Sequence, residues 1–203
     1  MNSMVNQSRP STSARLDQIV AATRRLFVLH GYRRTSKDDI ASEAGVSKAT
    51  LYLHFDGKEA IFKALIDACR AQIRARTAAA ETEKSTLQAC LAGLLYAYFG
   101  TSLEWFGDSS YLRELYVVVK QDPVTFGPAA DEDQLAARLH AVLSAAVRRQ
   151  ELQPARGLDV KIVARVLMDA ATGAKRGGDI KPEDYRRRIE DATRVVLAAL
   201  GGR

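Results

Sequence analysis

The chain has 203 residues, of which 47% are hydrophobic and 27% are charged, as in a globular protein with one or two domains. No apolar run approaches the roughly 18 residues that cross a bilayer, and the N-terminus lacks the apolar core of a signal peptide. We therefore expect a cytoplasmic protein that does not bind membranes. The formal net charge of +6 favours an anionic partner such as nucleic acid.

Much of the positive charge lies near the N-terminus. The first 65 residues contain ten Lys and Arg residues against six Asp and Glu residues, so this third of the chain carries +4 of the net +6. The pairs Arg24-Arg25 and Arg33-Arg34 are more typical of solvated helix faces than of phosphate contacts, and so is the run Arg186–Arg188.

The hydrophobic pattern predicts an all-α fold, because apolar residues recur every three or four positions and strand-like alternation is absent. The first twelve residues, rich in Ser and Asn, are expected to form a flexible tail. Residues 13–57 are expected to form a three-helix domain, and residues 58–203 a larger helical domain. The predicted helices span residues 13–30, 37–44, 48–55, 57–80, 86–106, 110–121, 131–150, 158–175 and 183–200.

Local signals mark the ends of the first helices. Gly31 follows an apolar stripe that includes Phe27 and His30, and glycine tolerates the left-handed conformation that often ends a helix. Ser36 precedes the second helix, and Asp39 three residues later completes a capping box. These signals predict an ordered start to the segment that follows.

Residues 35–63, TSKDDIASEAGVSKATLYLHFDGKEAIFK, contain two short helices joined by a tight turn. Gly45 suits this turn, because the chain reverses there with a positive φ. Ser47 caps the second of these helices, on which Leu51 and Phe55 share one face at about 100° per residue. That face is expected to be buried.

The opposite face of this helix is poorly suited to water. Ala49 and Leu53 expose apolar surface beside Thr50. In a DNA major groove, apolar groups contact thymine methyls and Thr bonds base edges, while the flanking Tyr52 and His54 can donate to phosphates. Taken singly, Tyr52 is more typical of a partly buried aromatic and His54 of a surface or core histidine, so the prediction depends on the combination.

The segment LFVLHGYRRTSKDDIASEAGVSKATLYLHFDGKEAIF closely resembles the DNA-binding domain of the TetR/AcrR family of transcriptional regulators, over roughly residues 15–65. Beyond residue 65 the resemblance is limited to an all-α domain of the expected length. The resemblance implies an N-terminal helix-turn-helix domain that binds double-stranded operator DNA. It also implies a second domain that binds a small-molecule effector and forms a homodimer. Because most members of the family repress transcription, we expect a repressor.

The resemblance also implies roles for single residues. Leu53 departs from the family pattern, in which larger or polar residues also occur, so the operator sequence cannot be transferred. The candidate DNA contacts are Thr35 and Lys37 at the start of the second helix, Ser47, Lys48, Ala49, Thr50 and Leu53 at the groove, and Tyr52, His54 and Lys58 at phosphates.

The last two predicted helices are candidates for the dimer interface, because each carries an apolar stripe. The alternative is that both stripes pack within one subunit. The stripes comprise Val160, Val163, Val166, Leu167 and Ala170 on one helix and Ile189, Ala192, Val196 and Ala199 on the other.

Aromatic residues are dense between residues 96 and 126. Most are expected in the core, but some are predicted to line a pocket for an apolar or aromatic ligand. The candidate lining residues are Tyr96, Phe99, Trp105 and Tyr116.

Two other classes of function are weighed against DNA binding. An enzyme is disfavoured because none of the three His residues falls in HExxH or a metal-ligand spacing, and GxSxG is absent. Cys69 and Cys90 are expected to be structural thiols rather than a redox pair, and we expect no catalytic residue, metal or cofactor. A ligand-binding or interaction protein with a degenerate helix-turn-helix is the second alternative.

Overall fold

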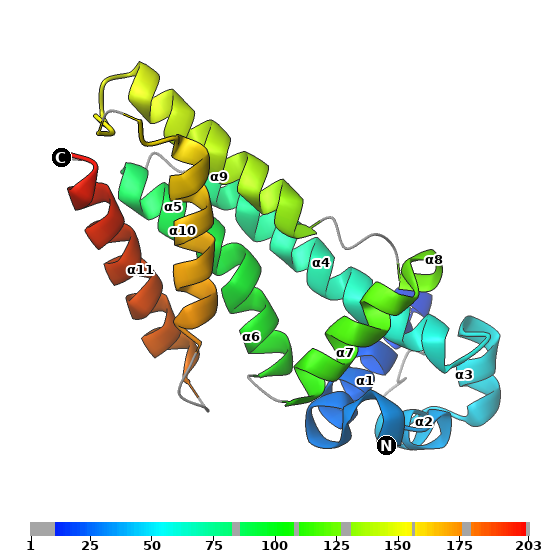
Figure 1. Cartoon of the computed structure of the whole chain (residues 1–203). Helices are drawn as coiled ribbons and strands as arrows, with labels where there is room; N and C mark the ends of the chain where they lie inside the picture. Colours follow the sequence, from blue (N-terminus) through cyan, green and yellow to red (C-terminus); the bar gives the residue numbers. More distant parts are fainter. Residues whose placement is uncertain are drawn as a thin grey trace, which may run out of the picture. The chain divides into compact units, whose positions relative to one another are not determined.

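The computed structural model describes residues 11–82, 86–107, 110–126, 131–155, 157–175 and 180–201. These ranges contain helices and no strand, which confirms the predicted all-α class (Figure 1). Contacts divide the chain into two compact units, Met1–Ile66 and Asp67–Arg203, and the division falls inside helix α4 (Lys58–Thr82). Of the predicted flexible tail, residues 1–10 lie outside the described residues, and Thr12 already begins the first helix.

The N-terminal unit is built around a small aromatic core. Phe27 and Phe62 are both fully buried, and their rings meet edge to face with centroids 5.8 Å apart. Because Phe62 belongs to α4, the first turns of that helix group with this unit, and the domain boundary between residues 57 and 58 stays a prediction. The other helices of the unit are α1 (Thr12–Arg34), α2 (Lys37–Glu43) and α3 (Lys48–His54).

Gly31 interrupts α1 as the sequence predicts, with φ 76° and ψ 174°. His30, expected on the inner stripe, is exposed, and this expectation was wrong. The helical path ends at Gly31, so the buried stripe stops at Phe27 and Gly31 itself fills the next inward position.

The larger unit is a helical bundle in which α9 packs on α5 and α10, while α11 packs on the same two helices. Helices α10 and α11 lie side by side along α5 (Figure 1). Besides the rest of α4, its helices are α5 (Leu87–Leu95), η1 (Tyr96–Gly100), α6 (Thr101–Phe106), α7 (Ser110–Gln121), α8 (Pro123–Phe126), α9 (Asp131–Arg148), α10 (Val160–Gly173) and α11 (Pro182–Ala199).

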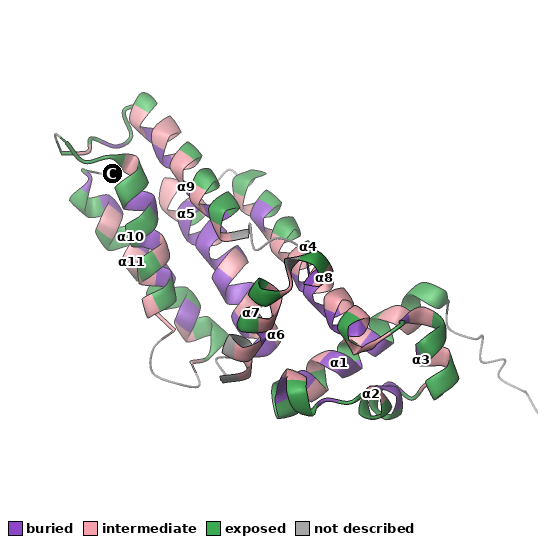
Figure 2. Cartoon of the chain, turned by 45° about the vertical axis from the view of Figure 1, so that its right-hand side comes forward, coloured by how far each residue is buried: buried purple, intermediate pink, exposed green. Residues whose placement is uncertain are grey.

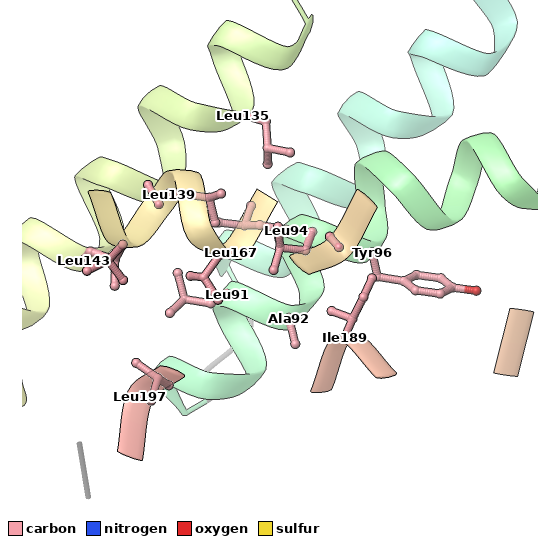
Figure 3. Close-up of a cluster of buried hydrophobic side chains, with 14 of the residues drawn as sticks. Leu91, Ala92, Leu94, Tyr96, Leu135, Leu139, Leu143, Leu167, Ile189 and Leu197 are labelled. Carbon is pink, nitrogen blue, oxygen red and sulfur yellow. The ribbon is translucent and has the colours of Figure 1, made fainter. Parts of the chain in front are cut away.

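Leucines of α5, α9 and α10 pack together in the core of this bundle (Figure 3). Leu91 of α5, Leu139 and Leu143 of α9, and Leu167 of α10 are all fully inaccessible to water. Burying a leucine side chain stabilises the folded state by about 1.5–3 kcal/mol. The cluster therefore fixes the positions of the helices that surround it.

The predicted helix over residues 86–106 forms without a break from Leu87 to Phe106, but its backbone hydrogen-bonding pattern changes within it. Residues Tyr96–Gly100 form a π-helical segment between α5 and α6. A Cβ at Gly100 would lie 2.7 Å from the Tyr96 ring, so the ring crosses the helix where only glycine leaves room. The periodicity of the sequence does not reveal this local change.

A short helix, α8, was missed because Asp122-Pro123 was interpreted only as a helix end. Proline suits the first position of a helix, where its missing N–H costs no hydrogen bond. The Asp122 carboxylate accepts a hydrogen bond from the Thr125 N–H at 3.0 Å. Hydrogen bonds from the Thr125 side chain and N–H hold the pKa of Asp122 below its ordinary value. The same dipeptide thus ends α7 and starts α8.

Candidate nucleic-acid interface

Helices α2 and α3 are joined by the tight turn that the sequence predicts. Gly45 has φ +64°, and open space surrounds its missing side chain, so its role is conformational rather than steric. Ile40 and Ala44 on one side and Leu51 on the other are at most 2% exposed. This small core fixes α3 on α2.

Serine caps set the first residues of both helices. The Ser36 hydroxyl accepts a hydrogen bond from the Asp39 N–H at 3.1 Å, and the Asp39 carboxylate accepts from the Ser36 N–H at 3.1 Å. Hydrogen bonds from the Ser36 hydroxyl and N–H hold the pKa of Asp39 below its ordinary value. Ser47 accepts from the Thr50 N–H at 3.0 Å and shares a hydrogen bond of 2.8 Å with the Thr50 hydroxyl.

The buried and exposed faces of α3 are those predicted from a rotation of about 100° per residue. Leu51 is 1% exposed, whereas Leu53 is 80% exposed and Tyr52 is 48% exposed. Ala49 is also exposed, and Figure 2 shows most of α3 in the colour of exposed residues. A single exposed apolar side chain is common on protein surfaces, so Leu53 is informative only together with the exposed Ala49 on the same helix.

Lysine side chains surround this face and are held by neighbours. The Lys48 ammonium lies 2.6 Å from an oxygen of Asp38, and the Lys37 ammonium lies 4.5 Å from the centre of the Tyr52 ring. The hydrogen bond and charge of Asp38 raise the pKa of Lys48 above its ordinary value. Both contacts cross from α2 to α3 and orient candidate DNA contacts before any partner binds.

Lys58 lies at the head of α4, where it donates a hydrogen bond of 3.3 Å to the Arg33 carbonyl and sits 4.4 Å from the Tyr32 ring centre. Its ammonium is therefore positioned beside the last turn of α1. His54 is half-buried at the end of α3.

Thr35 differs from the other candidate contacts. It is 1% exposed, and its hydroxyl donates a hydrogen bond of 2.8 Å to the Gly31 carbonyl. The side chain thus stabilises the chain reversal after α1, and a DNA contact by Thr35 stays a prediction.

Asp38 is part of the candidate interface although it was not predicted to be. Asp38 and Lys48 are ten residues apart and on different helices, so no local pattern signals their pairing. Arg25 is likewise paired with Glu43 at 2.6 Å across α1 and α2. Both partners of each pair remain partly exposed.

The aromatic residues proposed to line a ligand pocket have different surroundings. Tyr96 is 5% exposed and lines an open groove of about 400 Å³ with Arg186, whose guanidinium lies 3.8 Å from the tyrosine ring centre. Phe99 is 7% exposed and packs in the leucine core, while the Trp105 indole N–H donates to the Gln72 side chain at 2.5 Å. The side chain of Tyr116 lies outside the described part of the chain.

The described residues hold no group of three His, Cys, Asp or Glu side chains arranged to bind a metal ion. Among these residues, no helix is long and apolar enough to cross a membrane. Cys69 is buried and Cys90 half-buried, and neither is in a disulfide.

Comparison with known proteins points to one family. Residues 19–65 match the family model described as bacterial regulatory proteins, tetR family. The transcriptional regulator TtgR of Pseudomonas putida is 33% identical over 98 residues, which are 47% of this chain and 46% of the relative. IcaR of Staphylococcus aureus, a negative regulator of the biofilm operon icaADBC, is 40% identical over 53 residues, which are 26% of this chain and 28% of the relative. The matches thus span less than half of these relatives.

The fold is similar over nearly the whole chain. The ketosteroid transcriptional regulator KstR2 of Mycobacterium tuberculosis superposes with a TM-score of 0.67 and 22% sequence identity, covering 94% of this chain and 96% of that one. An identity this low is informative about architecture alone.

Proposed function

Because the chain belongs to the TetR family of bacterial regulatory proteins, we propose that it is a transcriptional regulator that binds a palindromic operator in double-stranded DNA as a homodimer. The observation that carries the proposal is the outer face of α3, where an 80% exposed Leu53 lies beside Ala49 and Thr50. In a major groove, such a face contacts thymine methyls and base edges. A regulator of this kind works on the chromosome, and the proposal therefore places the protein in the cytoplasm.

The flanks of α3 supply the phosphate contacts in this proposal. Tyr52 is half-exposed beside Lys37, and Lys48 at the start of α3 and Lys58 at the start of α4 provide further ammonium groups. Phosphate contacts fix the register of a protein on the duplex but carry no sequence information themselves. Specificity therefore rests on Ala49, Thr50 and Leu53.

An apolar stripe on α10 supports the proposed dimer. Ile162 and Val166 lie four residues apart on α10, and Leu158 directly precedes its N-cap; each is at least 36% exposed. Val195 of α11 is 69% exposed. Two copies of this surface would bury both stripes across a two-fold axis.

Part of the stripe expected from the sequence lies elsewhere. Val163, Leu167 and Ile189 are at most 4% exposed and belong to the core of the subunit. The expectation that they form the dimer contact was wrong, because the inward faces of α10 and α11 are used to close the bundle. The proposed dimer contact is instead the exposed face of α10, which carries Ile162 and Val166, the residues that directly precede the buried Val163 and Leu167.

We further propose that a small apolar or aromatic effector releases the regulator from its operator, and that it represses transcription. The negative regulator IcaR among the relatives supports repression as the direction of control. Helix α4 is the element shared by both compact units, so an effector that favours one position of α4 would change the spacing of the two recognition helices. The shift is limited to the difference in effector affinity between the two states.

Fluorescence anisotropy with a labelled duplex tests the proposal. The double variant Lys48→Ala/Tyr52→Ala removes two exposed candidate contacts and should lower DNA affinity. It should also reduce the slope of log affinity against log salt by about 0.9 for each lost phosphate contact. Lys181→Ala, which removes an exposed lysine of the larger unit, should bind as the wild type does. If the wild type shows no salt-dependent DNA binding, the alternative of a degenerate helix-turn-helix is correct.

A further inference from the structure

The larger unit contains a small cavity that opens between α4, η1 and α9. Its volume is about 40 Å³, and it is open to solvent on one side. On the same measure a cavity needs roughly 10–15 Å³ to hold one water molecule, so this one fits a small polar group. The lining residues are Arg70, Ile73, Arg74 and Thr77 of α4, Tyr98 of η1, and Gln134, Leu135 and Arg138 of α9.

Three guanidinium groups surround this cavity, and two of them are fixed by the protein. Arg138 donates to both carboxylate oxygens of Glu81 at 2.7 Å. Arg70 donates to the Phe126 carbonyl at 2.5 Å and lies 4.0 Å from the Asp67 carboxylate. The carboxylates of Glu81 and Asp67 thus offset two of the three positive charges.

Arg74 is the third guanidinium, and it differs from the other two. It is exposed, and it makes no hydrogen bond or ion pair with another residue in the ranges that the structure describes. Its donors are therefore available for an anion at the cavity, where the surrounding charge is net positive. A guanidinium binds a carboxylate through two parallel hydrogen bonds when the geometry allows.

Thr77 supplies a second polar group. It is 7% exposed and lies one helical turn from Arg74 on the same face of α4. Buried helix threonines usually donate to the carbonyl four residues earlier, as Thr193 does at 2.8 Å to Ile189. Within the described part of the chain the Thr77 hydroxyl has no such partner, and its oxygen is not fully buried, so it keeps some access to the cavity. A ligand oxygen in the cavity would satisfy it.

The remaining walls are apolar. Leu135 is 3% exposed, Ile73 is half-buried, and the Tyr98 ring is held edge to face against Phe99 with centroids 4.9 Å apart. The cavity holds only the polar head of a ligand, between Arg74 and Thr77. An apolar body would extend from the opening along the partly exposed Ile73 and Tyr98.

We propose that this cavity binds the carboxylate head of a small amphipathic acid, which is the effector of the regulator. The inference rests on the proposed function and narrows its effector class from apolar or aromatic molecules to those that also carry one negative charge. Because Arg74 and Thr77 belong to α4, the ligand acts on the helix that the two compact units share.

Isothermal titration calorimetry of the full chain without DNA tests the site with two matched pairs of probes, 2-naphthoate against 2-naphthamide and decanoate against decanamide. The wild type should bind each carboxylate about tenfold or more tighter than its amide, as a charge-assisted hydrogen bond predicts. Arg74→Gln should remove this preference, and Thr77→Val should weaken carboxylate binding. Arg187→Gln, which changes an exposed arginine of α11 outside the cavity, should bind as the wild type does.

Three results would overturn the proposal: equal affinity for carboxylates and amides, unchanged carboxylate binding by Arg74→Gln, and no binding of either acid at millimolar concentration. Inorganic phosphate is the control for a site that takes any anion, and phosphate binding as tight as that of 2-naphthoate would also refute the amphipathic class. Circular dichroism confirms that each variant is folded. DNA affinity is measured separately, and Arg74→Gln should retain it. Failure of DNA binding would reject the proposed function, whereas failure of the calorimetry would reject this effector class alone.

Discussion

The ion pair between Asp38 and Lys48 makes a prediction opposite in sign to the usual loss of DNA affinity on mutation. The Lys48 ammonium lies 2.6 Å from the Asp38 carboxylate, and the two side chains are 65% and 60% exposed. A phosphate that binds Lys48 must therefore compete with Asp38, and the carboxylate repels the phosphate as well. Asp38→Asn removes both effects while keeping a side chain of the same size.

The magnitude follows from the exposure of the pair. Exposed ion pairs are weak, and their strength corresponds to roughly a one- to fivefold change in an equilibrium constant. Asp38→Asn should therefore raise affinity for a non-specific duplex about two- to fivefold. The slope of log affinity against log salt should steepen by up to about 0.9, the value for one added phosphate contact.

Anisotropy titrations at several salt concentrations measure both the affinity and the salt slope. The variants Lys48→Ala and Asp38→Asn/Lys48→Ala complete a double-mutant cycle. In the Lys48→Ala background the gain from Asp38→Asn should shrink, because only the direct repulsion is relieved. An equal gain in both backgrounds would refute the idea that Asp38 acts through Lys48. Weaker binding by Asp38→Asn would refute the placement of this pair at the interface.

Three further predictions concern the larger unit. Val166→Glu places a charge on the proposed dimer surface, where the wild-type side chain is 45% exposed, and should give a monomer by sedimentation velocity; a persistent dimer would locate the interface elsewhere. Gly100→Ala should lower the free energy of unfolding by about 1–3 kcal/mol, as overpacking does, because the new Cβ would lie 2.7 Å from the Tyr96 ring; unchanged stability in urea would mean that the ring moves freely. Glu104→Gln should lower the free energy of unfolding at neutral pH by about 1.5–3 kcal/mol, the range for hydrogen bonds to charged groups. Burial favours a higher pKa for Glu104, but hydrogen bonds from Arg76 and Tyr96 outweigh it and lower the pKa. The carboxylate therefore stabilises the fold above its ordinary pKa, and this contribution is lost as the pH falls through the lowered value. A wild-type advantage over the variant that grows toward acid pH would contradict this.

Local signals in the sequence predict much of the N-terminal unit. Gly31 and Gly45 adopt positive φ, and the capping box of Ser36 and Asp39 forms as expected. Each of these features depends on residues within a few positions of one another. The buried and exposed faces of α3 also follow from helical geometry alone.

Features that depend on tertiary packing were not predictable in the same way. Thr35 is buried because its hydroxyl closes the reversal after Gly31, and Lys48 is paired with a residue of another helix. The π-helical segment arises where the Tyr96 ring crosses Gly100, a contact that the hydrophobic period does not encode.

The division of apolar residues on α10 shows the same limit. The helical period identifies Val163 and Val166 as members of one stripe, but neighbouring helices bury the first and leave the second exposed. Sequence spacing predicts that a face is apolar, whereas only the packed bundle decides which part of that face is covered within the subunit.

The central claim is that α3 reads DNA as one of two symmetric copies. Selection of bound duplexes from a random pool, with the wild-type chain as bait, tests this claim most directly. If α3 binds in this way, the selected pool is enriched in a palindrome whose half-sites lie about one helical turn or more apart. Enrichment that is absent, or that is confined to a single unpaired half-site, would contradict it.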